Sequence, residues 1–231
     1  MANESAQQES SRSTAKFVFL FAFLLIDLAL YPYGGQPTFA PWFRLLNILI
    51  AVSSVYAVSF RRLTWIVALV IAVPVVIHRG ILYDITLTPT KLGLASEALS
   101  VAFDTFIIIV IFRRAFDAKE VTSGAIYGAV SIYLLVGFAF SKLYSMLVAL
   151  QPGAFYLDPV LNHHTLPNVT DLTYYSFVTM TSLGAVGISP VSDQARSLSV
   201  IESVLGILYL GVLVSRLIAT YRPSHDSDPQ P

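Results

Sequence analysis

The sequence contains no cysteine and few charged residues. The absence of cysteine excludes disulfide bonds, thiolate catalysis and cysteine-ligated metal sites. Charged residues make up only 12% of the 231 positions and hydrophobic residues 55%, whereas a soluble domain has about 25% charged residues. The net charge is +0 and Lys and Arg form no basic stripe, so no nucleic-acid partner is expected. This composition predicts an integral membrane protein.

Sequence motifs of catalysis are missing as well. The chain has no phosphate-binding loop, no H-E-x-x-H zinc motif and no nucleophile elbow. We therefore expect neither enzymatic activity nor a cofactor.

Six apolar stretches approach the length of about 20 residues that a helix needs to cross the hydrocarbon. They lie at residues 16–33, 42–60, 63–83, 92–112, 123–150 and 196–220. If the N-terminus is cytoplasmic, most basic residues outside these stretches fall on the cytoplasmic side, as the positive-inside rule requires. The sequence predicts an all-α membrane protein with six transmembrane helices and both termini in the cytoplasm.

A charged stretch at residues 113–122 divides the chain. We expect it to be a cytoplasmic linker between a peripheral four-helix domain, residues 16–112, and a second domain, residues 123–221. Polar tails at 1–15 and 222–231 are expected to be disordered. A voltage sensor would need basic residues at every third position of its fourth span, and residues 92–112 contain none.

The last two spans are separated by about 45 residues, many more than antiparallel neighbours need. This insert contains a helical segment too short to span, with Asp171 at its start and Thr170 as the expected N-cap. Irregular backbone at membrane depth is tolerated only when it is buried in protein or lines a water-filled cavity. We therefore expect TMTSLGAVGISPVS, residues 179–192, to face a pore or a cavity.

The same region resembles the pore of bacterial six-transmembrane potassium channels. Around the selectivity filter that family reads approximately F-V-T-L-T-T-L-G-Y-G-D-I-T-P-V, and FVTMTSLGAVGISPV aligns with it without a gap. The resemblance covers roughly residues 123–221. It implies a re-entrant pore helix and a filter made of Thr181, Ser182, Leu183, Gly184, Ala185, Val186 and Gly187.

The resemblance also implies an assembly and a location. Family members are homotetramers in the lipid bilayer, and backbone carbonyl rings from four subunits replace the hydration shell of a permeating monovalent cation. For this chain we accordingly expect a homotetramer in the inner membrane of the cell that passes K⁺ and Na⁺.

The chain departs from the family at the centre of the filter, where Gly184-Ala185-Val186-Gly187 replaces Gly-Tyr-Gly-Asp. The gapless alignment puts Val186 at the second glycine, and a left-handed backbone costs a β-branched residue on the order of 1–3 kcal/mol. A shift that gives this place to Gly187 would misalign the Ile-Ser-Pro-Val that follows, so we reject it. Ala185 lacks the bracing aromatic ring, and Gly187 lacks the carboxylate that anchors the outer end.

We expect the inner carbonyls, around Ser182, Leu183 and Gly184, to persist as coordinating rings and the outer ones to be lost or widened. Fewer rings predict a cation channel of reduced K⁺ selectivity. The alternative is a non-conducting scaffold or regulatory subunit that keeps the pore fold.

The last span carries further candidates. Gly206 stands where the family has a gating-hinge glycine, although close packing of helices beside Gly211 explains it equally well. The resemblance implies that Ile207, Leu210 and Val214 face the pore axis, where an apolar ring could gate by dewetting.

Two charged residues, Lys142 and Glu202, lie inside apparent spans, where an isolated charge is costly. We expect them to pair with each other or to tie the pore helix down, and a direct role in permeation is the alternative. His163 and His164, with Asp158 and Asp171 nearby, read either as part of an exposed loop or as a proton or metal sensor.

Overall fold

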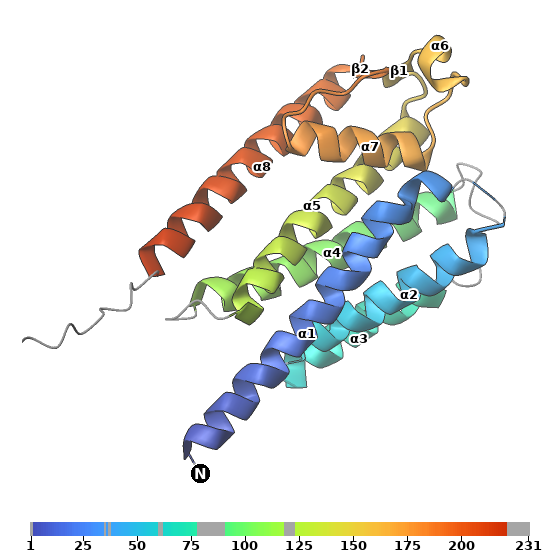
Figure 1. Ribbon diagram of the computed structural model, residues 1–231. Helices are drawn as coiled ribbons and strands as arrows, with labels where there is room; N and C mark the ends of the chain where they lie inside the picture. The colour runs from blue at the N-terminus through green and yellow to red at the C-terminus, as the bar shows by residue number, and fades with distance from the viewer. Residues whose placement is uncertain are drawn as a thin grey trace, which may run out of the picture.

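The computed structural model describes residues 2–34, 36, 38–59, 62–77, 91–117 and 123–220. Long helices dominate it, and one short helix and a small strand pair lie near its upper end (Figure 1). The elements are α1 (Ala2–Leu30), the 3₁₀ helix η1 (Tyr31–Tyr33), α2 (Ala40–Ala57), α3 (Arg62–Ile77), α4 (Lys91–Asp117), α5 (Ser123–Leu150), β1 (Phe155–Leu157), α6 (Pro159–Asn162), α7 (Val169–Met180), β2 (Ile188–Pro190) and α8 (Asp193–Thr220).

Five helical stretches are long and apolar enough to cross a membrane. They are Thr14–Tyr33, Ala40–Ala57, Gly93–Arg114, Ser123–Leu150 and Asp193–Arg216. Each matches one predicted span. The predicted span at 63–83 begins in α3, which has 16 residues and contains Pro74, and its remainder lies outside the described residues. Among the described residues the structure therefore gives five candidate spans, and the sixth span stays a prediction.

Two predicted boundaries differ from the structure. Residues 2–15, expected to be a disordered tail, are helical and continue into the first span as α1. Similarly, α4 continues to Asp117, so residues 113–117 of the expected linker are helical. Both segments are rich in helix formers and extend an existing helix, which avoids the cost of nucleation. Residues 118–122 and 222–231 lie outside the described part of the chain.

Two of the peripheral helices, α1 and α4, pack on α5, which lies between them and α8 (Figure 1), while α2 packs on α1 and α3 packs on α4. Small residues on α5 allow this approach: a side chain at Gly124 would meet Thr14 of α1, and one at Gly128 would meet Phe17 and Ile111. The fully buried side chains of this core include Leu20, Leu24, Ile107, Ile111 and Ile132.

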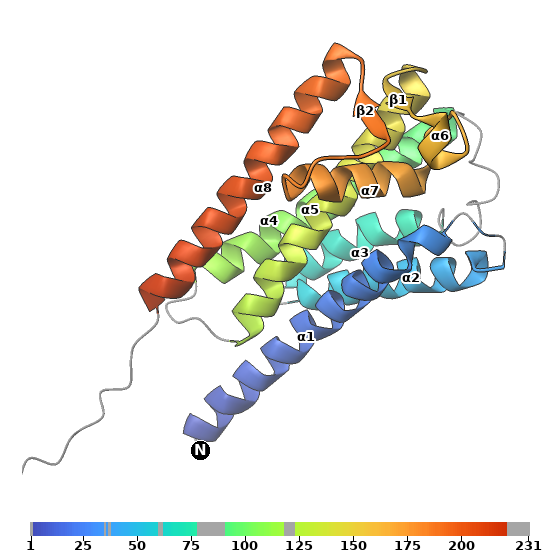
Figure 2. The same cartoon turned by 45° about the horizontal axis from the view of Figure 1, so that its top comes forward.

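The helix α7 crosses α5 near the upper end of the molecule and reaches α8 (Figure 2). Tyr144 of α5, Phe155 of β1 and Tyr175 of α7 contact one another edge to face, with ring centroids 5.1–5.3 Å apart. Such aromatic pairs add roughly 0.5–1.5 kcal/mol each beyond the area they bury. This buried triad fixes α7 to α5 and to the first strand.

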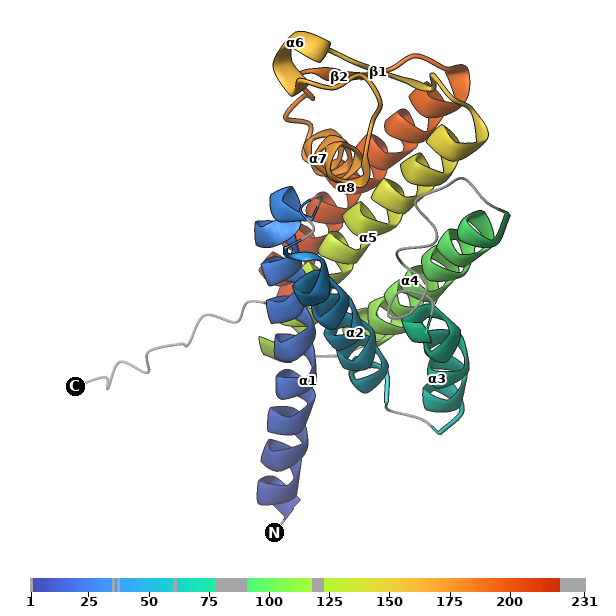
Figure 3. The same cartoon turned by 90° about the vertical axis from the view of Figure 1, so that its right-hand side faces the viewer.

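A small antiparallel sheet closes the loops on either side of α7. Phe155 pairs with Pro190, Tyr156 with Ser189 and Leu157 with Ile188. Together with α6, this sheet lies above α7 (Figure 3). The turret, residues 151–168, is thereby attached to the segment that follows α7.

Candidate functional site

The short helix α7 begins with a capping box. The Asn168 side chain accepts a hydrogen bond from the Asp171 amide at 3.1 Å, and the Asp171 carboxylate accepts one from the Asn168 amide at 2.8 Å. The predicted N-cap, Thr170, is wrong because this reciprocal pair satisfies two otherwise unpaired backbone donors two residues earlier. The Asn-x-x-Asp pattern at residues 168–171 is the sequence signal that could have predicted this cap.

Directly after α7, three consecutive backbone amides turn back toward the helix. The amides of Ser182, Leu183 and Gly184 donate to carbonyls in the last turns of α7 at 3.0, 2.9 and 3.4 Å. In a trans peptide the carbonyl points opposite to the amide of the next residue, and the described chain has no cis peptide. The carbonyls of residues 181–183 therefore point away from α7.

The next part of the segment follows the same rule. The Val186 amide donates to the Tyr174 hydroxyl of α7 at 3.4 Å, so the Ala185 carbonyl also points away from the helix. Among the described residues, none donates a hydrogen bond to the carbonyl oxygens of residues 181–186. Leu183 and Val186 are 77% and 69% exposed. The carbonyls of residues 181–183 and 185 thus point away from α7. Together with those of Gly184 and Val186 they form what we call the carbonyl row, whose oxygens accept no hydrogen bond from the described part of the chain.

Left-handed backbone occurs at three places here: Ser182 with φ 57°, Gly184 with φ 87° and Gly187 with φ 82°. Val186 is not among them, so the expected backbone strain at Val186 is absent. After Gly184, the next left-handed residue is Gly187, and glycine adopts this conformation freely. The β2 strand still follows at Ile188, so this assignment requires no displacement of the flanking sequence.

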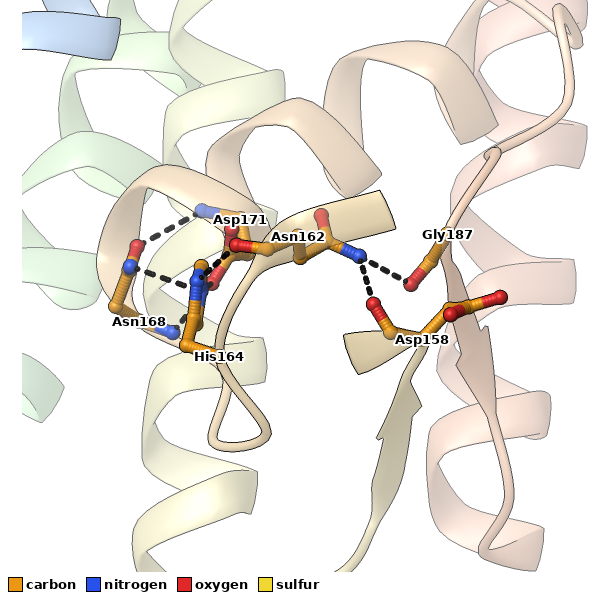
Figure 4. A network of polar contacts seen from close by, with 6 residues as sticks. All are labelled: Asp158, Asn162, His164, Asn168, Asp171 and Gly187. Carbon is orange, nitrogen blue, oxygen red and sulfur yellow. Dashed lines mark hydrogen bonds and ion pairs between the residues drawn. The ribbon is translucent and has the colours of Figure 1, made fainter. Parts of the chain in front are cut away.

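The outer end of the segment is anchored by the turret. The Gly187 carbonyl accepts a hydrogen bond from the Asn162 side-chain amide at 2.9 Å (Figure 4). It accepts a second one from the Asp158 amide at 2.8 Å. Two donors occupy both lone pairs of a carbonyl oxygen. Unlike the carbonyls of residues 181–186, this one has no capacity left for an ion. Sequence reasoning missed Asn162, because its contact with Gly187 joins residues 25 positions apart.

The predicted pair between Lys142 and Glu202 is not formed. Lys142 forms an ion pair with Asp104 of α4, while Glu202 accepts a hydrogen bond from the Tyr144 hydroxyl at 2.6 Å. Residues 142 and 144 project from α5 about 200° apart, so the two side chains face different neighbours. Hydropathy did not show this difference, because both faces of α5 are apolar.

Glu202 also connects α8 to α7. Its carboxyl accepts a hydrogen bond from the Ser176 hydroxyl of α7, which lies 2.7 Å from the Gly137 carbonyl of α5. Glu202 and Ser176 are fully buried. A second hydrogen bond between α7 and α8 joins the hydroxyl groups of Tyr175 and Ser199, which lie 2.6 Å apart. These bonds hold α7 between α5 and α8 at the level of the carbonyl row.

Gly206 has a packing role in the structure. A Cβ atom there would lie 2.3 Å from the Met180 carbonyl oxygen at the end of α7, whereas one at Gly211 would meet nothing within 4 Å. Gly206 thus packs against the end of α7, and Gly211 takes no part in this contact. The helix α8 is continuous through both glycines. The expected pore-facing residues Ile207, Leu210 and Val214 are exposed.

The two turret histidines have different surroundings. His163 is exposed at the end of α6 with φ 60°, whereas His164 lies within hydrogen-bond distance of the Asn162 carbonyl, 2.6 Å, and of the Asp171 carboxylate, 2.8 Å. Both oxygens can only accept, so the ring satisfies both contacts only as the imidazolium. The bond to Asp171 is the main cause that raises the pKa of His164. Among the described residues, no three metal-ligating side chains gather into a metal site.

Comparison with known proteins gives one match. Residues 129–222 match the family model described as ion channel. The match begins within α5 and ends just after α8, so it contains α7 and the carbonyl row. It covers less than half of the chain and supports a transmembrane protein with an ion-channel domain in this part. No match was found among the curated proteins or among the solved structures.

Proposed function

We propose that the protein is a homotetrameric pore-loop channel that passes monovalent cations, K⁺ and Na⁺, with reduced selectivity. In this proposal the filter is the segment Thr181–Gly187, four copies of it surround a central axis, and α1–α4 lie at the periphery. The membrane is the inner membrane of the cell, with both termini on the cytoplasmic side.

The observation that carries the proposal is the row of carbonyls at residues 181–186. An unpaired backbone carbonyl costs several kcal/mol in hydrocarbon, so this row requires water, an ion or another subunit on its free side. One chain supplies only one wall of a pore. Four symmetric copies would convert each carbonyl into a ring of four ligands, the arrangement by which potassium channels replace the hydration shell of the ion.

The reduced selectivity follows from the outer end of the filter. The Gly187 carbonyl is directed to the turret and saturated by two donors, which removes one coordinating ring. Ala185 contributes no aromatic ring to brace the segment from behind, and a single hydrogen bond of 3.4 Å joins the Val186 amide to α7. Fewer and less firmly held rings discriminate less between K⁺ and Na⁺.

The α8 helix supports the assembly. Apolar side chains are exposed around it, among them Ile207, Leu210 and Val214, and it is the least buried of the five candidate spans. In a tetramer one side of α8 would contact the neighbouring subunit and another would line the pore below the filter.

Flux from liposomes tests the proposal. Purified protein should release both K⁺ and Na⁺ down their gradients, while liposomes without protein should retain them, and cross-linking in detergent should yield four copies per particle. A tetramer that carries no flux of either ion would favour the non-conducting scaffold or regulatory subunit. A monomer would contradict the proposal.

A further inference from the structure

The filter of this chain is held at its two ends by different elements. Its inner amides bond to α7, but its outer residue, Gly187, bonds to the turret. The Asn162 side-chain amide donates to the Gly187 carbonyl at 2.9 Å and lies 2.8 Å from the place where a Gly187 Cβ would be. A side chain at position 187 would therefore displace the Asn162 amide. The contact occupies the end of the segment where the acidic anchor of the channels that this region resembles is missing.

Asn162 is itself firmly positioned (Figure 4). Its amide and its side chain both donate to the Asp158 carbonyl, at 3.0 and 2.9 Å. Its carbonyl is contacted by His164, whose other ring nitrogen contacts Asp171 of the capping box. The side chain of Asn162 thus lies at one end of a chain of contacts whose other end is the start of α7.

We propose that Asn162 is a positioning residue for the filter, which keeps the Gly187 carbonyl turned toward the turret and out of the ion path. This inference rests on the proposed channel function. With the Asn162 donor removed, only the Asp158 amide holds the carbonyl, so the Gly187 peptide gains the freedom to rotate. The adjacent Val186 backbone, which has one long hydrogen bond to α7, would loosen with it.

A cysteine probe measures this loosening without requiring conduction. The chain has no native cysteine, and Ile188, next to Gly187, is only 3% exposed. Ile188→Cys therefore reacts with a water-soluble thiol reagent only when the outer end opens. Adding Asn162→Ala should raise the reaction rate about threefold to tenfold, the factor expected for the loss of one hydrogen bond.

Three further variants make the test specific. Asn162→Asp has the same shape but lacks the N–H donor, and should behave like the alanine variant even where alanine fails to fold. Asn162→Gln retains the donor and should restore a slow rate in part. Val160→Ala changes a neighbouring side chain of α6 that is 79% exposed, and should leave the rate unchanged.

Bilayer currents then distinguish the positioning role of Asn162 from the proposed channel function. We expect the reversal potential between K⁺ and Na⁺ to shift in Asn162→Asp and not in Val160→Ala. An unchanged labelling rate, or an unchanged reversal potential in a conducting protein, would overturn the positioning role while the channel function stands. Faster labelling in a protein that carries no current would contradict the channel function, and with it any role in selectivity, but would leave the backbone anchor in place.

Discussion

The inner and outer ends of the proposed filter, residues 181–187, are held by different elements. At the inner end, residues 181–184 match closely the sequence of the potassium channels that this region resembles, and their amides bond to α7. At the outer end, residues 185–187 depart from those channels, and the anchor comes from the turret through Asn162 and Asp158. In the proposed channel, the turret thus supplies hydrogen bonds at the outer end, where residues 185–187 lack the anchor that potassium channels have.

The largest expected effect comes from breaking the inner end. Gly206→Ala places a methyl group 2.3 Å from the Met180 carbonyl, where backbone must move. Overpacking of this kind costs about 1–3 kcal/mol, and the clash would be repeated in each subunit of the proposed tetramer. We expect loss of the monodisperse peak in gel filtration and a lower unfolding temperature. Gly211→Ala is the matched control, since its methyl meets nothing within 4 Å. Equal behaviour of the two variants would contradict the packing of α8 against α7.

Restoring the outer end should sharpen selectivity. Replacing residues 184–187 by Gly-Tyr-Gly-Asp returns a glycine to position 186 and an acidic anchor to position 187. We expect this anchor to displace the Asn162 amide and the left-handed conformation to move from position 187 to the glycine at 186. The permeability of K⁺ relative to Na⁺ should rise about tenfold, which corresponds to about 1.4 kcal/mol of differential ion binding. The ratio is read from reversal potentials in planar bilayers. A ratio that does not change would mean that the outer carbonyls do not determine selectivity.

A smaller effect is expected from the contact that holds α7 to α8. Glu202→Ala removes the acceptor of the buried Tyr144 hydroxyl and one of the two acceptors near Ser176, which keeps the Gly137 carbonyl. The loss should cost about 1 kcal/mol. Thermal unfolding in detergent should show a lower midpoint. Glu202→Gln keeps an oxygen acceptor at the same place and should lose less. If both variants unfold with the midpoint of the unchanged protein, Glu202 does not tie the helices together.

The smallest effect is a pH dependence of the outer end. The pKa of His164 is raised above its ordinary value of 6.5, chiefly by the hydrogen bond to Asp171. The groups that face this ring are the Asp171 carboxylate, the Asn162 carbonyl and the Asn168 side chain. The folded state binds the His164 proton more tightly than the unfolded chain does. This protonation therefore stabilises the folded state fully below pH 6.5, and the stabilisation is lost as the pH rises through the raised pKa of His164.

This dependence is measured as the labelling rate of Ile188→Cys divided by that of Leu166→Cys. Leu166 is an exposed turret position, so the division corrects for the ionisation of the thiol. The ratio should increase as the pH rises through the raised pKa of His164. In His164→Gln it should stay flat. A ratio that rises equally in both proteins would assign the effect to another group.

The sequence predicted the parts of this molecule that depend on local pattern. Hydropathy located five of the helices that could cross the membrane, and the flanks of the filter indicated α7 and the irregular segment after it. It did not predict the partners of Lys142 and Glu202, because a helix that is apolar on all sides gives no signal of its rotation.

The backbone of the filter shows a second limit. The alignment assigned the left-handed position to Val186, but the structure gives it to Gly187, because conformational preference outweighs alignment register for a β-branched residue. The anchor at Asn162 depends on a contact between residues 25 positions apart. No local pattern encodes such a contact.

The reversal potential of the unchanged protein in a planar bilayer, with K⁺ on one side and Na⁺ on the other, tests the central claim most directly. We predict a measurable current whose reversal potential shows only a weak preference for K⁺. The absence of current under any gradient, or a strong preference for K⁺, would contradict this account of the filter.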